Sequence, residues 1–127
     1  MANKLRKTWY GFTGNEGAIA SDNLSVINSE LLSIDATSGK VVSADGTQEI
    51  KWVATGSHTY WTNEEILFVR KNENLRVDLN TDADLTQAMV GDKFDINASQ
   101  VVVTGAAGDQ VELVEIIDTR VGRFKIV

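Results

Sequence analysis

Cysteine and proline are absent from this chain of 127 residues, and histidine occurs only once. Without cysteine there is no disulfide framework, no thiolate nucleophile and no zinc site of the usual kind. The single His58 excludes multi-histidine metal sites and leaves one candidate for imidazole chemistry. Because proline is missing, the turns must be built on the ten glycines and on small polar residues.

Long apolar runs and an excess of basic residues are also missing. No stretch is long and apolar enough for a transmembrane helix. The start of the chain is basic, but Asn15 and Glu16 interrupt the only window for a signal peptide. The net charge of −6 disfavours binding to a phosphate backbone. We therefore expect a soluble, unsecreted protein that contacts neither membrane nor nucleic acid.

Short apolar runs separated by turn residues make up most of the chain. Residues 105–109 are predicted to form a hairpin loop between two strands, and Asp45-Gly46 is a hairpin-type dipeptide. The pattern predicts an all-β fold, either a small β-barrel or a sandwich. The strands are expected at residues 24–26, 31–34, 41–42, 50–54, 66–71, 93–96, 100–104, 110–117 and 123–127.

One short helix is expected at about residues 82–90. Thr81 and Asp84 have the spacing of a capping box, in which each side chain bonds a free backbone N–H group of the first turn. Apolar residues follow at helical spacing, and Gly91 is a natural end because glycine adopts the left-handed conformation at little cost.

Residues 1–20 differ from the rest and predict an extended N-terminal arm ahead of a single domain, residues 21–127. The arm is basic, then aromatic, and has glycines at 11, 14 and 17, which disfavour a regular element. Its aromatic residues either close one end of the core or anchor the arm on a partner. The candidate partner-binding residues are Lys4, Arg6, Lys7, Trp9, Tyr10 and Phe12.

Two further patterns suggest binding sites. The loop after Gly56 carries His58, Tyr60 and Trp61, and together with Trp52 it is a candidate stacking platform for an oligonucleotide or a sugar. Oxygen ligands at alternate positions in residues 78–84 are typical of a calcium loop, although Ala83 stands where such a loop has glycine. The other interpretations are a partly packed aromatic loop and a solvated acidic turn.

No nucleophile–base pair is evident, and Glu64 and Glu65 are neighbours that point to opposite faces of a strand. We therefore expect no enzymatic activity, no cofactor and no bound metal. The function is then either that of a structural, partner-binding protein or that of a ligand-binding module using residues 52–61.

The order of these features resembles the small head decoration, or cement, proteins of tailed bacteriophages. The resemblance covers about 90 residues by order and spacing, and residues 1–20 lie outside it. The best match is a strand, a short helix and the entry Gly91-Asp-Lys-Phe-Asp-Ile96 to the next strand. The other matching segments are residues 31–39, 40–42, 50–56, 66–69, 85–90, 101–103, 112–116 and 122–127.

The resemblance implies a structural virion protein without catalytic residues. Such proteins bind the outer surface of the capsid, commonly as homotrimers, and clamp adjacent subunits of the major capsid protein. The arm would then add contact area without enlarging the core. Whether it contacts its own trimer or the shell is open at this stage.

Overall fold

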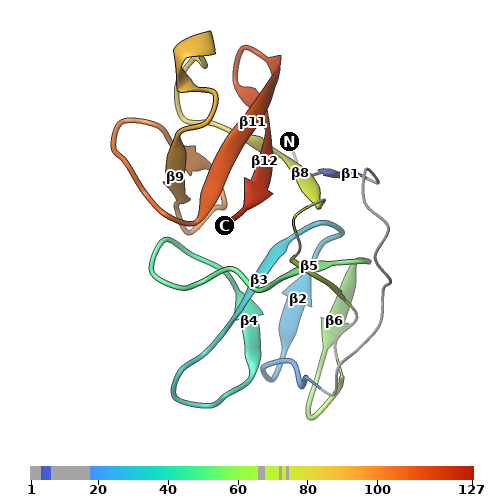
Figure 1. Cartoon of the computed structure of the whole chain (residues 1–127). Helices are drawn as coiled ribbons and strands as arrows, with labels where there is room; N and C mark the ends of the chain where they lie inside the picture. Colours follow the sequence, from blue (N-terminus) through green and yellow to red (C-terminus); the bar gives the residue numbers. More distant parts are fainter. Residues whose placement is uncertain (1–3, 7–17, 66–67, 72, 74) are drawn as a thin grey trace.

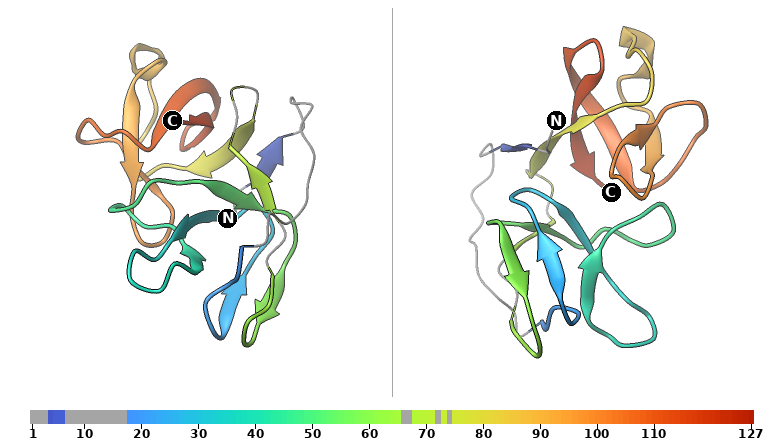
Figure 2. Two further views of the ribbon diagram at one scale, coloured as in Figure 1. Left: turned by 60° about the horizontal axis from the view of Figure 1, so that its bottom comes forward. Right: turned by 180° about the vertical axis from the view of Figure 1, so that it is seen from behind.

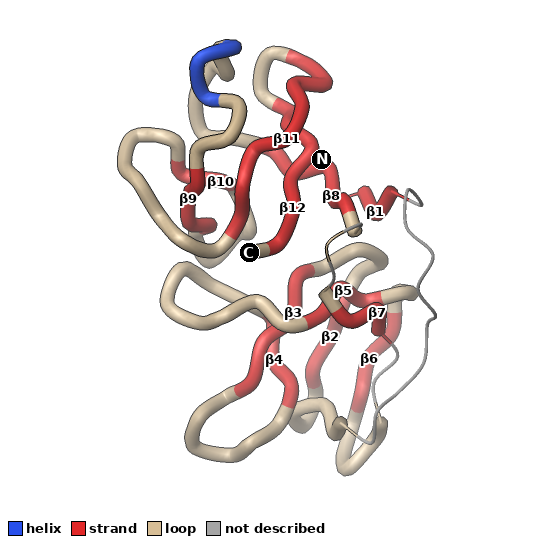
Figure 3. Tube along the Cα trace, viewed as in Figure 1, coloured by secondary structure: helices blue, strands red, loops and turns tan. Residues whose placement is uncertain are grey.

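The computed structural model describes residues 4–6, 18–65, 68–71, 73 and 75–127. These residues form short strands and one 3₁₀ turn but no α-helix, which confirms the predicted all-β class (Figure 3). The elements are β1 (Lys4–Arg6), β2 (Leu24–Val26), β3 (Leu31–Ile34), β4 (Val41–Ser43), β5 (Trp52–Ala54), β6 (His58–Tyr60), β7 (Phe68–Arg70), β8 (Arg76–Asn80), η1 (Gln87–Met89), β9 (Lys93–Ile96), β10 (Val102–Val103), β11 (Val111–Asp118) and β12 (Val121–Ile126).

The largest sheet contains six strands in the order β1-β8-β12-β11-β9-β10 (Figure 1). Every pair in it is antiparallel. The sheet curls until the residue after β8, Thr81, forms a parallel bridge with Val102 of β10. The main-chain N–H of Asp82 donates to the Val102 carbonyl (3.0 Å). The sheet is therefore a half-barrel joined along one seam. The sequence had left open whether the all-β fold would be a barrel or a sandwich.

A second sheet, ordered β4-β3-β5-β7, packs against the half-barrel, and the two-stranded β2–β6 ribbon lies on its other side. Figure 2 shows this layering from two directions. The alternation of side chains between the two faces of β3 and β5 explains this layering. Leu31 and Val53 enter the main core with the half-barrel residues, whereas Leu32, Trp52 and Ala54 enter a second core beneath the ribbon. The middle sheet is therefore buried on both faces.

Two buried glutamines link the half-barrel to the loops of the middle sheet. The Gln100 amide nitrogen donates to the carbonyls of Leu31 (2.7 Å) and Ala44 (3.2 Å), and its oxygen accepts from the Leu31 N–H (2.9 Å). The Gln110 amide nitrogen donates to the carbonyls of Asp45 (2.7 Å) and Gln48 (2.6 Å). Both side chains thus satisfy buried backbone groups where the half-barrel meets the middle sheet, and the Leu31 carbonyl also accepts from the Ala44 N–H (2.9 Å).

The two predicted hairpins are wrong in their pairing. β10 and β11 flank the predicted hairpin loop, yet β9 lies between them in the sheet. The strands on either side of Asp45-Gly46 are likewise separated by β3. In both cases the glycine-containing loop crosses to pack on β9: a Cβ on Gly46 would lie 2.6 Å from the Ile96 carbonyl oxygen.

The helix predicted at about residues 82–90 is reduced to the 3₁₀ turn η1. In a helix capped at Thr81 the Leu85 N–H would donate to the Thr81 carbonyl, but here it donates to the Thr119 carbonyl (2.8 Å). The Thr81 hydroxyl donates to the Ala83 carbonyl and does not cap. Gly91 does end the turn in a left-handed conformation, with φ of +94°.

Replacing Gln100 tests the link between the two sheets. Gln100→Ala removes the acceptor of the buried Leu31 N–H and the side-chain donor to the Ala44 carbonyl, and each unsatisfied buried group costs about 1–3 kcal/mol. We expect the free energy of unfolding, measured by urea denaturation, to fall by about 2–4 kcal/mol. Gln87→Ala, at an exposed position of η1, should change it by less than about 0.5 kcal/mol. Equal unfolding midpoints for the two variants would contradict this role.

Two glycines of the loop between β10 and β11 form a matched pair. A Cβ on Gly108 would lie 2.5 Å from the Phe94 carbonyl carbon and closer still to the Asp95 nitrogen, whereas a Cβ on Gly105 would meet nothing within 4 Å. We expect Gly108→Ala to destabilise the protein by about 1–3 kcal/mol, as overpacking does. Gly105→Ala should be close to neutral in the same denaturation measurement. A similar loss of stability in both variants would show that the loop is sensitive to any added side chain and that the contact with β9 is not the cause.

Candidate functional site

The predicted arm begins as part of the half-barrel. Lys4 and Arg6 lie in β1, which adds an edge strand to the six-stranded sheet with the register Lys4↔Asp78 and Arg6↔Arg76. These two residues are therefore held by backbone pairing to β8 and do not form a free basic tip (Figure 1). The remaining candidate partner-binding residues, Lys7, Trp9, Tyr10 and Phe12, lie outside the described residues.

The other end of the predicted arm is also paired. Ala20 donates its N–H to the Glu64 carbonyl (2.9 Å), and Val41 donates to the carbonyl of Ile19 (2.8 Å). Ala20 is itself buried in the second core. The described residues on both sides of 7–17 are therefore paired, Lys4–Arg6 with the half-barrel and residues 19–21 with the middle sheet and Glu64.

A row of alternating charges crosses the outward face of the half-barrel beside β1. Arg123 of β12 donates to Asp78 (Nε–Oδ1, 3.0 Å) and to Glu115 (Nη1–Oε2, 3.0 Å). The bond to Asp78 raises the pKa of the Arg123 guanidinium. Asp78 is only 5% exposed, so this pair is shielded from water and holds β8 to β12 through side chains as well as backbone.

The aromatic candidates do not form one platform. Trp52 and Tyr60 are buried in the second core, where Trp52 stacks on Phe68 with ring centroids 4.8 Å apart. His58 packs edge-on against Tyr60, and its Nε2 lies 3.6 Å from a Glu64 carboxylate oxygen. Of the aromatic candidates only Trp61 is largely exposed, at 61%. The stacking surface proposed for residues 52–61 is thereby reduced to one tryptophan beside an exposed histidine.

The acidic candidates in residues 78–84 have separate partners. Asp78 bonds Arg123, and Asp84 bonds Arg120 (2.8 Å) on the turn between β11 and β12. Asp82 accepts the Thr104 main-chain N–H (2.9 Å) and hydroxyl (2.8 Å). Within the described part of the chain, no three histidine, aspartate or glutamate side chains gather into a possible metal site.

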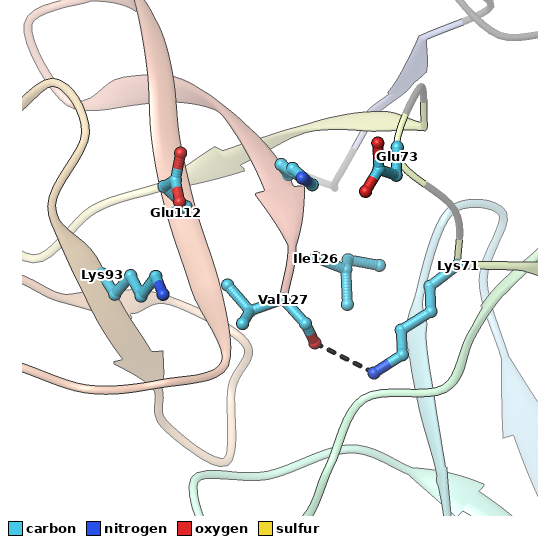
Figure 4. A pocket seen from close by; sticks show the side chains of 7 residues that line it. Lys71, Glu73, Lys93, Glu112, Ile126 and Val127 are labelled. Atoms are coloured by element: carbon cyan, nitrogen blue, oxygen red, sulfur yellow. Dashed lines mark hydrogen bonds between the residues drawn. The ribbon is translucent and has the colours of Figure 1, made fainter.

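A pocket that the sequence analysis did not identify lies where the half-barrel meets the middle sheet. Its volume is about 310 Å³, and it is lined by Lys71, Glu73, Lys93, Glu112, Lys125, Ile126 and Val127. Figure 4 shows Lys71 and Lys93 reaching toward Val127 from opposite sides. Lys71 donates to the main-chain oxygen of Val127 (2.9 Å) and to Glu49 (2.9 Å), and this bond lowers the pKa of Glu49.

Strand alternation contained a partial signal for this pocket. Phe94, Val111 and Phe124 are buried, so their neighbours Lys93, Glu112 and Lys125 face outward. The observed register places Glu112 opposite both lysines, one on β9 and one on β12. Alternation predicts the outward direction of each side chain, but the pairing of β9 with β11 was needed to bring the three together.

Asp82 gives a pH-dependent test of the half-barrel seam. Its bonds to Thr104, first the main-chain N–H and then the hydroxyl, lower the pKa of Asp82 below its ordinary value of 3.8. A carboxylate with a lowered pKa stabilises the fold above its unfolded pKa, and this contribution is lost as the pH falls through the folded pKa. Asp82→Asn keeps an acceptor but has no charge to lose.

We expect the difference in unfolding free energy between the wild type and Asp82→Asn to be largest above about pH 5 and to shrink toward about pH 2. Urea denaturation at a series of pH values measures it. Other titrating carboxylates are common to both proteins and cancel in the difference. A difference that stays constant over this range would show that the charge of Asp82 does not support the seam.

Comparison with known proteins identifies no relative of this chain. No protein-family model, no curated protein and no solved structure matches the chain. Among the residues that the structure describes, no helix is long and apolar enough to span a bilayer. Any assignment of function therefore rests on the residues and geometry of the chain itself.

Proposed function

We propose that the protein is a non-enzymatic structural protein of a phage virion. In this role it binds the outer surface of the capsid as a homotrimer and clamps adjacent subunits of the major capsid protein. The proposal is supported by the resemblance in element order and by the all-β fold. Its main support is that the described residues on either side of the candidate anchors Trp9, Tyr10 and Phe12 are paired within the fold.

Tethering matters because of the entropy of binding. A free terminal tail loses much conformational freedom when it docks, and this loss subtracts from the affinity of its contacts. Pairing at Lys4–Arg6 and at residues 19–21 holds these two points of the chain in the fold before a partner arrives. Aromatic side chains between such points suit the role of binding anchors, which are commonly tryptophan or tyrosine.

The alternative of an oligonucleotide- or sugar-binding module has less support. It needs several exposed aromatic rings, and burial of Trp52 and Tyr60 leaves Trp61 alone. Glu64 lies beside that tryptophan and bonds its main-chain N–H (3.2 Å), which adds a negative charge to the loop. A polyanion is therefore disfavoured there.

Co-sedimentation with expanded, DNA-free heads assembled from the major capsid protein of the same phage tests the proposal. We expect the full chain to bind saturably, with three copies at each occupied three-fold position. The triple variant Trp9→Ala/Tyr10→Ala/Phe12→Ala should bind at least roughly tenfold more weakly, because such anchors each contribute on the order of 1–2 kcal/mol or more. This variant keeps β1, so the edge of β8 stays covered, whereas deletion of residues 1–14 would expose it.

Trp61→Ala is the matched control, since it removes an exposed tryptophan outside segment 7–17. It should bind the heads as the wild type does. Failure of the full chain to bind would refute the capsid role. An equal loss in Trp61→Ala and the triple variant would move the contact away from the arm, and saturation at one copy per position would rule out the trimer.

A further inference from the structure

The pocket at the junction of the half-barrel and the middle sheet is basic in an otherwise acidic molecule. Three of its lining side chains are lysines and two are glutamates, although the whole chain has a net charge of −6. The pairing of Phe124 with Val77 brings Arg76 of β8 next to Lys125 in the same outward row. Cations therefore lie on β8, β12 and β9, with Glu112 of β11 between Lys125 and Lys93.

Two of these lysines are available for binding. Lys71 is already bonded to Glu49 and to the Val127 main chain. Within the described residues, Lys93 and Lys125 have neither a hydrogen bond nor an ion pair through their ammonium groups. Glu112 lies between them in register but bonds neither. The ammonium groups therefore face the pocket with their hydrogen-bonding capacity unused.

We propose that this pocket binds a carboxylate-bearing, extended segment of a protein partner. A carboxylate placed between Lys93 and Lys125 would accept charge-assisted hydrogen bonds from both, which are stronger than neutral ones. The volume of about 310 Å³ is at the small end of the range for binding pockets, so it suits one or two side chains and not a folded surface.

The two glutamates select the class of occupant. Glu73 and Glu112 would repel the continuous negative charge of a nucleic acid backbone, as would the net charge of the whole chain. An acidic polypeptide carries separate carboxylates with backbone N–H groups between them. These N–H groups can donate hydrogen bonds to the same two glutamates. Charge complementarity thus favours an acidic peptide over a polynucleotide.

The described residues that line this pocket come from β9, β11, β12 with Val127 after it, and the segment after β7, and none of the candidate partner-binding residues of the arm is among them. That the partner is a capsid subunit rests on the proposed function, but the binding of an acidic segment does not. The pocket can therefore be tested without capsids, and a negative result there leaves the co-sedimentation experiment able to decide the capsid role.

Fluorescence anisotropy with the full-length chain and a fluorescein-labelled ten-residue peptide, in which glutamate alternates with glycine, tests the pocket. We expect Lys93→Gln/Lys125→Gln to weaken binding roughly tenfold or more, and Glu112→Gln to strengthen it by removing a competing carboxylate. The control Lys40→Gln/Arg120→Gln removes two positive charges of the same kind from ion pairs outside the pocket and should change binding less than about twofold. Thermal unfolding checks that each variant is folded.

Salt should weaken binding of the peptide, because both lysines are accessible to solvent. The proposal is overturned if the wild type does not bind the peptide, or if the control variant loses as much affinity as the pocket variant. It is also overturned if a labelled ten-nucleotide oligothymidylate binds as tightly as the peptide. An unchanged or lower affinity in Glu112→Gln would place the binding elsewhere on the surface.

Discussion

The need to satisfy buried backbone groups governs how the two sheets of this protein meet. Where the half-barrel packs on the middle sheet, several buried backbone groups, among them the Leu31 N–H and the carbonyls of Asp45 and Gln48, are bonded by side chains. Gln100 and Gln110 reach these groups with amide side chains that donate and accept at once. An apolar side chain of the same size would fill the space but leave the backbone unbonded, at a cost comparable to the stability of many small domains when several groups are involved.

This constraint also explains where prediction from the sequence succeeded and where it failed. Alternation and turn residues identify most strands, because they depend on neighbouring residues alone. They do not reveal that β9 separates β10 from β11, or that β3 separates β4 from β5. Those pairings depend on Gly46 and Gly108 packing on β9 and on the two glutamines, which are contacts between segments distant in sequence. The capping-box pattern at Thr81 likewise predicts a helix that the seam with β10 replaces.

The candidate sites show the same difference between what neighbouring residues predict and what contacts between distant segments decide. Aromatic and acidic residues are easy to find in the sequence, but their exposure and their partners are not. Trp52 and Trp61 resemble one another as candidates, yet the first is 5% exposed and the second 61%. The lysines of the pocket were visible as single outward-facing residues, and only the register between β9, β11 and β12 shows that Lys93 and Lys125 lie on either side of Glu112. Residues 7–17, in which the main partner-binding prediction lies, remain to be tested through their function.

The pairing of β1 with β8 has a consequence for the order of folding. The first described strand of the chain has its only described strand partner in Arg76–Asn80, and β8 is in turn paired with β12 near the other end. Contacts this distant in sequence slow folding, because a large loop must close before they form. During synthesis Lys4–Arg6 emerges from the ribosome long before its partner strand, so this segment waits with unpaired backbone groups until most of the chain has been made. The outermost strand of the half-barrel is therefore the first to be made and among the last to be placed.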